Sequence, residues 1–278
     1  VFTASLPKHS NFHGYHLLAA DGSELSFPEN KKEPLCHRKI PNTQKGKNAI
    51  HLNALYHLNS GIFDQVLFQP VHEKDEHSAL ITMLAQTEIS SKVILTADRG
   101  YESYNTFAHI LEKGWNFVIR GRQGDRGILS SLAIPDQEQF DVECPVVICK
   151  KHCRGTKEQP ELYKRIRSGA KFDFFTEEQT EYPMKLRVIK LKVNEDLSEI
   201  LFTNLSKEEM PVGMLQELYR FQILIAAVDI GHPFPILLSV IQVEHGGHRI
   251  HPDAVGVILV RPEPVSYTHL RAHETLRH

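Results

Sequence analysis

Two short apolar segments, each followed directly by an aspartate, constrain the fold of this chain most strongly. Residues 15–20 lead into Asp21, which begins the triplet Asp-Gly-Ser, and residues 92–97 lead into Asp98. A short apolar run that ends in turn-forming residues predicts a buried strand followed by a turn. Because the sites of α/β sheets form where strands end, both carboxylates are candidate site residues.

The other patterns in residues 1–122 place these two strands in an α/β sheet. Residues 49–58 and 62–71 predict two strands, and the Asn-Ser-Gly turn between them predicts a hairpin. Apolar side chains at helical spacing predict helices over 74–87 and 103–113, followed by Gly114 and a strand over 115–120. The order strand, strand, strand, helix, strand, helix, strand is that of the ribonuclease-H-like fold, an α/β mixed sheet with helical crossovers.

The sequence pattern changes over residues 123–205. Strands are predicted over 140–149, 184–193 and 200–205, and polar, charged stretches without a comparable helix signal separate them. We interpret this segment as a β-rich insertion. A helix is predicted to follow over 207–219, since Met214, Leu215 and Leu218 share one face.

The chemistry of two strand-end carboxylates favours a divalent metal site. Asp21 and Asp98 offer hard oxygen ligands of the kind that Mg²⁺ takes, and two such ions about 3.5–4 Å apart activate the attacking oxygen and stabilise the leaving one in phosphoryl transfer. Both residues fit this role if their strands lie side by side. The alternative is that each aspartate only forms a turn with its nearby glycine.

The charge of the whole chain does not indicate a nucleic-acid partner, because the formal net charge is -2. A DNA-binding surface therefore needs a local basic face. One candidate lies between the first two strands and contains Lys31, Lys32, His37, Arg38, Lys39, Lys45 and Lys47. A flexible basic loop beside the metal site would bind phosphates. The alternative is a surface loop whose charges are only solvated by water. We take Lys39, Lys45 and Lys47 as candidate DNA contacts; further basic stretches lie at 150–154 and 164–171.

The four cysteines are Cys36, Cys144, Cys149 and Cys153, with His152 inside the cluster. Their spacing does not match a strong zinc pattern such as paired C-x-x-C. We therefore interpret them as reduced thiols of a cytoplasmic protein, on or beside strands, and a zinc site is the alternative. No signal peptide is recognisable at Val1.

Several motifs resemble those of the insertion-sequence-four transposases, over about residues 15–219. LLAADGSELSFP (17–28) resembles the first-Asp motif of this family, ILTADRGYESYNTFAHI (94–110) the second-Asp motif, and GWNFVIRGR (114–122) the strand after it. ILFTNLS (200–206) and LQELY (215–219) resemble the lead-in to the third catalytic element. The second-Asp motif is the most specific, since it matches over many consecutive residues.

The resemblance implies a DDE transposase with a ribonuclease-H-like core. In that family two Asp and one Glu bind two divalent ions, Mg²⁺ or Mn²⁺, and a β-rich domain precedes the Glu-bearing helix. The implied domains are 1–122 for the first part of the core, 123–205 for the insertion, 206–220 for the start of the Glu-bearing region and 221–278 for a tail. The resemblance also implies DNA ends and target DNA as partners, two protomers paired across two ends, and no membrane association. Arg99, beside Asp98, either holds the scissile phosphate or pairs with a carboxylate, and Tyr219 is a candidate DNA contact.

The third catalytic element departs from the family pattern. That pattern has Tyr, then Arg, Glu and Lys three, seven and fourteen residues later on one helix. Tyr219 matches, but Gln222, Ala226 and Pro233 stand at the other positions. The proline would break the helix. We therefore expect this copy to be inactive, and nothing in the sequence favours Glu102 or Glu217 as a substitute.

Residues 221–278 are foreign in composition to the preceding chain. They contain none of the 18 Lys but 7 of the 17 His. We favour a frameshifted or foreign reading frame over a separate C-terminal domain. The apolar run 221–243 is too interrupted by Asp229, His232, Pro233 and Pro235 to predict a membrane span.

Three hypotheses follow from the sequence. The first is a transposase that has lost its third catalytic element. The second is a non-catalytic DNA-binding remnant. The third is another ribonuclease-H-like nuclease whose third carboxylate lies elsewhere.

Overall fold

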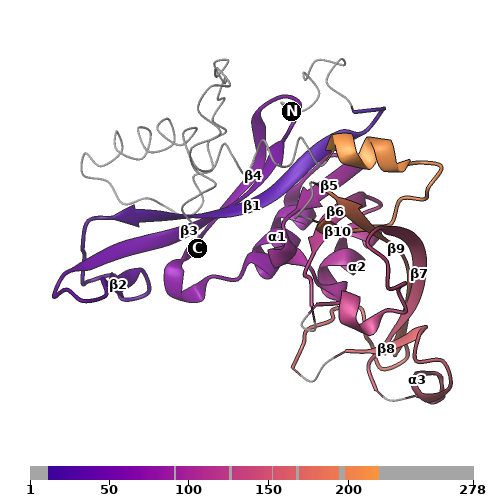
Figure 1. The fold of residues 1–278 in the computed structure, drawn as a ribbon. Helices are drawn as coiled ribbons and strands as arrows, with labels where there is room; N and C mark the ends of the chain where they lie inside the picture. The colour runs from indigo at the N-terminus through magenta and orange to yellow at the C-terminus, as the bar shows by residue number, and fades with distance from the viewer. Residues whose placement is uncertain are drawn as a thin grey trace.

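The computed structural model describes residues 12–90, 92–124, 127–151, 153–166, 169–193 and 198–218, and these fold around one mixed sheet of ten strands (Figure 1). The strands are β1 His16–Phe27, β2 His37–Lys39, β3 Gly46–His57, β4 Ile62–Pro70, β5 Val93–Ala97, β6 Asn116–Gly121, β7 Phe140–Cys149, β8 Tyr163–Arg165, β9 Glu181–Lys192 and β10 Ser198–Thr203. The helices are α1 Glu76–Gln86, α2 Tyr104–Glu112 and α3 Arg154–Glu158, and the 3₁₀ turns are η2 Val71–Glu73, η3 Arg99–Tyr101 and η4 Leu129–Ser131. Residues 212–218 form one further helical segment.

The first part of the sheet has the topology that the sequence predicts. Its strand order is β4, β3, β1, β5, β6, in which β1, β5 and β6 are parallel and β3 runs antiparallel to both of its neighbours. Helices α1 and α2 make the crossovers into β5 and β6. This arrangement confirms the α/β class and the ribonuclease-H-like mixed sheet, and the pairing of β3 with β4 confirms the predicted hairpin.

Helices α1 and α2 cover one face of the sheet because their apolar side chains fall on one side. Leu80 and Met83 of α1 and Phe107 of α2 are fully buried in the same core. Phe107 stacks on Phe117 of β6, with ring centroids 4.7 Å apart. Gly114, at φ +75°, ends α2 in the left-handed conformation that favours glycine.

The opposite face of the sheet is covered by residues that follow β10. Leu17, Ile94 and Val118 point to this face and form a second core with Leu215 and Leu218 of the segment 212–218. Adjacent strand residues such as Leu18 and Leu95 belong to the first core, as the two-residue period of a strand requires.

The β-rich segment continues the same sheet. β10 pairs with β6, β9 with β10, β7 with β9 and β8 with β7, so the sheet runs from β2 at one end to β8 at the other (Figure 1). The predicted strands over 140–149, 184–193 and 200–205 are confirmed as β7, β9 and β10, with shifted bounds for the last two. The short elements β8, α3 and η4 were not predicted. Whether 123–205 is a domain of its own stays a prediction.

The predicted turn at Asp21 is wrong. β1 continues to Phe27, because residues 18–27 pair with β3 in an unbroken antiparallel ladder. Packing explains the glycine at position 22 instead, since a Cβ atom there would collide with the imidazole ring of His51. In the part of the chain that the structure describes, no helix is long and apolar enough to cross a membrane.

Candidate active site

The two predicted aspartates occupy adjacent positions on neighbouring strands. β1 and β5 run parallel, and the last pair in their register is Ala20 opposite Ala97. Asp21 and Asp98 are the next residues on the two strands. Asp21 remains paired with Ala54 of β3, whereas Asp98 leaves β5 and precedes the 3₁₀ turn η3. The condition that both strands lie side by side is therefore met.

The two carboxylates differ in their surroundings. Oδ1 of Asp21 accepts a hydrogen bond of 2.8 Å from the backbone N–H of Gly22. Asp98 is half exposed, and its Oδ1 lies 3.2 Å from Nη1 of Arg120 on β6. Arg120, and not the adjacent Arg99, is thus the arginine that pairs with Asp98. Both carboxylates are hard oxygen donors that directly follow the parallel pairing of β1 with β5, and such donors suit a divalent metal ion.

A third carboxylate, which the sequence did not indicate as a site residue, lies near this pair. Glu76 is in the first turn of α1, and Cβ atoms built on Gly22 and Gly100 would lie 3.2 Å and 3.5 Å from its two oxygens. The negative charges of Glu76, Asp21 and Asp98 add to the effect of burial in raising the pKa of Tyr101. The three carboxylates therefore all act on the hydroxyl of one buried tyrosine.

Glu76 already has two neighbours, one of them a cation. Its Oε1 lies 2.8 Å from Nζ of Lys74, and 3.0 Å from Nε2 of the buried His51 without hydrogen-bond geometry. Burial, together with the charge of Lys74, lowers the pKa of His51, and Glu76 opposes this shift. Among the described residues, no third His, Cys, Asp or Glu converges with Asp21 and Asp98 within 4.8 Å. Asp21 and Asp98 thus offer only two of the three carboxylates that the resemblance implies.

Arg120 connects the site to a fourth carboxylate. Its Nη2 atom donates to Oε1 of Glu199 on β10 at 2.6 Å, while its Nη1 faces Asp98. Glu199 is only 8% exposed, so this arginine supplies the partner that a nearly buried carboxylate needs. Arg99 itself is exposed beside Asp98, and its backbone oxygen accepts a hydrogen bond from Arg122 at 3.1 Å.

The proposed substitutes for the missing Glu have other roles. Glu102 is buried and accepts hydrogen bonds from the backbone N–H groups of Arg122, at 2.5 Å, and Ile128. Glu217 is exposed on the segment 212–218, 3.6 Å from Nε2 of His13. Neither supplies a carboxylate to Asp21 and Asp98. Tyr219 lies outside the described residues.

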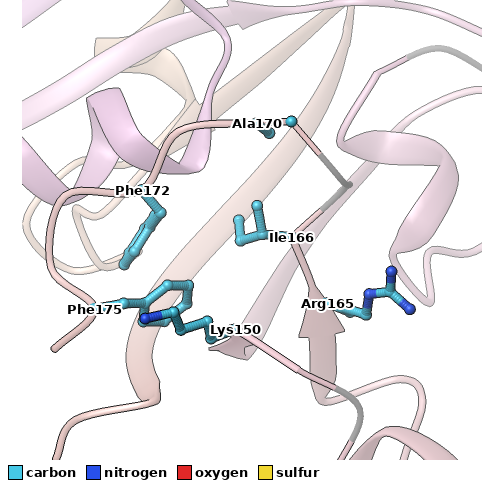
Figure 2. Close-up of a pocket in the computed structure, with 7 residues that line it drawn as sticks. Lys150, Arg165, Ile166, Ala170, Phe172 and Phe175 are labelled. Atoms are coloured by element: carbon cyan, nitrogen blue, oxygen red, sulfur yellow. The ribbon is translucent and has the colours of Figure 1, made fainter. Parts of the chain in front are cut away.

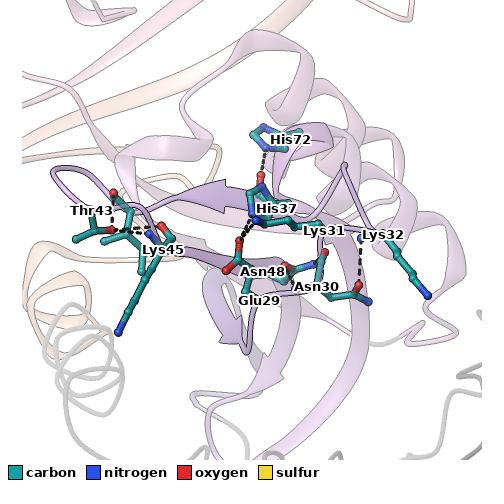
Figure 3. A network of polar contacts seen from close by, with 10 residues as sticks. Glu29, Asn30, Lys31, Lys32, His37, Thr43, Lys45, Asn48 and His72 are labelled. Atoms are coloured by element: carbon teal, nitrogen blue, oxygen red, sulfur yellow. Dashed lines mark hydrogen bonds and ion pairs between the residues drawn. The ribbon is translucent and has the colours of Figure 1, made fainter.

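The basic segment between β1 and β3 is ordered rather than a flexible loop (Figure 3). β2 pairs with β3, His37 lies 3.1 Å from Glu29, and Asn48 exchanges hydrogen bonds with Asn30. This segment is not beside the aspartates: Phe27, where β1 ends, is six residues beyond Asp21, a distance of about 20 Å along a strand.

The three candidate lysines of this segment differ in how far other side chains already bind their amines. Lys47 donates to Glu24 and Ser26 at 3.2 and 2.9 Å, so part of its charge is neutralised. The side chain of Lys45 extends away from the network, and Lys39 is exposed at the end of β2 (Figure 3). Lys39 and Lys45 are therefore more available to an anionic partner than Lys47.

The two later basic stretches meet at a pocket at the other end of the sheet. Arg165 of β8 pairs in register with Cys149 of β7, which brings it near Lys150. The pocket has a volume of about 350 Å³ and contains the rings of Phe172 and Phe175 beside Lys150 (Figure 2). Lys164 does not contribute, because it is buried and donates to the backbone oxygens of Ser131 and Pro160.

Residues 12–225 match the family model of the transposase DDE domain. No curated protein matches the chain. Among solved structures, the chain is similar to the piggyBac transposase in its synaptic complex with hairpin DNA, with 12% identity and a TM-score of 0.41. That similarity covers 69% of this chain and 34% of the piggyBac chain, so this chain spans about a third of that protein.

Proposed function

The chain belongs to the transposase DDE domain family, and on that premise we propose that it derives from a transposase that cuts and joins DNA at insertion-sequence ends. The observation that carries this proposal is the adjacency of Asp21 and Asp98, which directly follow the last paired residues of the parallel strands β1 and β5. The motifs at 17–28 and 94–110 favour the insertion-sequence-four group within the family. The DNA ends and the target DNA are the proposed partners, and two protomers would hold two ends.

Asp21 and Asp98 would hold a divalent metal ion, Mg²⁺ or Mn²⁺. When bound, such an ion lowers the pKa of a water ligand and stabilises charge on phosphate oxygens. The chain's own contribution is to hold the two carboxylates. The ladder between β1 and β3 fixes the backbone of Asp21, and the ion pair with Arg120 orients Asp98. Arg99 is exposed one residue later and would contact a phosphate of the substrate.

We further propose that this copy does not transpose. Ala226 stands where the family pattern has its catalytic Glu, and Gln222 and Pro233 replace its Arg and Lys. Two carboxylates leave one metal ion short of a ligand, and Glu76 is held by Lys74 instead of converging on the pair. DNA binding is then the activity that remains.

A gel-shift titration combined with a cleavage assay tests this proposal. The chain should bind DNA in a salt-sensitive manner and should not cut it with Mg²⁺ or Mn²⁺. Resequencing the 3′ end of the gene from independent DNA is the matched check on Ala226. A reading frame with Arg, Glu and Lys at the family spacing would overturn the proposal that this copy is inactive. Absence of DNA binding at low salt would overturn the proposed DNA-binding role.

Glu76 favours a second candidate function, that of a ribonuclease-H-like nuclease whose third carboxylate lies on α1. Its two oxygens lie beside Gly22, the residue after Asp21, and Gly100, two residues after Asp98. The chain itself would then cut branched DNA with Mn²⁺, and Glu76→Gln would abolish cutting. Glu73→Gln, three residues earlier and in η2, is the control. Equal cleavage by both variants would exclude Glu76 from the reaction.

A further inference from the structure

Three metal-ligating side chains converge outside the candidate active site. Cys149 is the last residue of β7, and Glu181, the first residue of β9, lies opposite it in the antiparallel register. Cys153 follows four residues later and precedes α3. The two sulfur atoms are 3.8 Å apart, and one ligand atom of each of the three residues lies within 4.8 Å of the others. This is the only such group among the residues that the structure describes.

We propose that Cys149, Cys153 and Glu181 bind one Zn²⁺ ion, with the fourth position open to water. Thiolate sulfur and carboxylate oxygen are common zinc ligands, and thiolates select zinc over Mg²⁺ or Ca²⁺. The two cysteines are separated by three residues, which lies within the two to four residues typical of zinc-binding cysteine pairs. The site is independent of the proposed transposase activity.

The separation of the two sulfur atoms fits a shared tetrahedral ion. Two sulfurs, each about 2.3 Å from zinc at a tetrahedral angle, lie about 3.8 Å from each other. The sulfur atoms of Cys149 and Cys153 have this separation without a metal. A disulfide would need about 2.05 Å, and both cysteines are free thiols. A hydrogen bond between the two thiols fits the same distance, so zinc binding itself must be tested.

The backbones of Cys149, Cys153 and Glu181 already have hydrogen-bonded partners, which reduces the ordering cost of binding. Cys149 and Glu181 are held opposite each other by the ladder between β7 and β9. Cys153 is held by Thr156, whose hydroxyl accepts from the N–H of Cys153 at 3.2 Å and donates to its carbonyl at 2.7 Å. The cluster is therefore arranged before any ion arrives.

An ion at this position would join three elements next to the basic pocket. It would connect the end of β7, the start of β9 and the residue before α3. Lys150, which lines the pocket, directly follows Cys149, and Arg165 pairs with Cys149 in register. Zinc would thus fix the backbone from which two cations of this surface extend.

Zinc content and thiol protection of the full chain test the proposal. After saturation with Zn²⁺ and removal of the excess, we expect about one zinc per chain by elemental analysis. Cys153→Ser, at a half-buried position, should abolish this zinc, and Glu181→Gln should weaken binding about tenfold or more, at least as much as loss of an outer-shell partner does. Cys36→Ser, the other half-buried cysteine, is the matched control and should keep the wild-type stoichiometry.

Alkylation gives a second readout that does not depend on one variant. Zinc should slow modification of Cys149 and Cys153 and leave that of Cys36 unchanged. Circular dichroism of each variant distinguishes a lost ligand from a lost fold. The same zinc content in wild type and Cys153→Ser, or equal alkylation with and without zinc, would overturn the proposal and leave a thiol pair joined by a hydrogen bond.

Discussion

Asp98 pairs with Arg120 on the next strand, 3.2 Å between Oδ1 and Nη1, although Arg99 follows it directly in the chain. The same guanidinium also holds Glu199, which is nearly buried. Arg120 thus serves two carboxylates, one on each neighbouring strand. Its loss would leave the carboxylate of Glu199 without its partner in a poorly solvated position.

The first prediction concerns stability at Arg120. Arg120→Gln should lower the free energy of unfolding by about 1–3 kcal/mol, mainly because Glu199 loses its charged donor. Arg38→Gln is the matched control, since Arg38 pairs with the carboxylate of Glu24 at 2.8 Å but both are more exposed. Exposed pairs contribute about 0–1 kcal/mol. Urea unfolding of both variants measures the two losses in the free energy of unfolding. Equal losses would show that the ion pair with Glu199 stabilises the fold no more than an exposed pair does.

The second prediction concerns metal binding. Asp21→Asn and Asp98→Asn should each weaken Mn²⁺ binding about tenfold or more, which corresponds to about 1.4 kcal/mol, because each removes one of two anionic oxygen donors. Glu24→Gln is the control: Glu24 lies on β1 three residues beyond Asp21, but it already pairs with Arg38 and Lys47. Calorimetric titration with Mn²⁺ gives the affinities. Wild-type affinity in both aspartate variants would remove the metal site from this position.

The two aspartates were predictable from local features, because each follows a short apolar run that predicts a buried strand. Their adjacency was not, since β2, β3 and β4 lie between β1 and β5 in the chain and α1 leads from β4 to the far side of β1. The predicted turn after Ala20 failed because residues 21–27 form a ladder with β3, and this long-range pairing overrides the turn preference of Asp21 and Gly22. The glycine instead leaves room for His51.

The features that sequence reasoning missed depend on contacts between distant residues. Glu76 in the first turn of a helix has a sufficient local explanation in the helix dipole, so nothing in its neighbourhood indicated a site. Its approach to Gly22 follows only from how α1 packs against the sheet. Likewise, a count of basic residues does not show that Glu24 neutralises Arg38 and Lys47 across the strands.

The third prediction concerns acid sensitivity. Burial, aided by the charge of His16, lowers the pKa of His57 from 6.5 to about 4. Well above pH 6.5 the histidine is neutral in the folded and the unfolded state, so it does not change the free energy of unfolding. As the pH falls from 6.5 to 4, the unfolded state binds a proton that the folded state does not, so stability is lost, by up to about 3 kcal/mol.

Replacing the histidine isolates this effect. His57→Gln should lose less stability than wild type between pH 6.5 and 4, whatever its stability at neutral pH. Asn53→Ala, at a buried position of the same strand and without a titrating side chain, is the control and should show the wild-type pH dependence. Chemical unfolding at several pH values measures both slopes. The same slope in wild type and His57→Gln would mean that His57 does not remain neutral in the fold.

The fourth prediction concerns the basic segment at the tip of the β1–β3 ribbon, and it rests on the proposed DNA binding. Lys39→Ala and Lys45→Ala should each weaken DNA binding and reduce the slope of log affinity against log salt by about 0.9, the value for one phosphate contact. Lys47→Ala should have a smaller effect, because Glu24 and Ser26 already engage its amine. Gel-shift titrations across salt compare the three variants. If all three keep the wild-type slope while the chain still binds DNA, the phosphate contacts lie elsewhere, and Lys150→Ala and Arg165→Ala at the second basic surface become the variants that should reduce it.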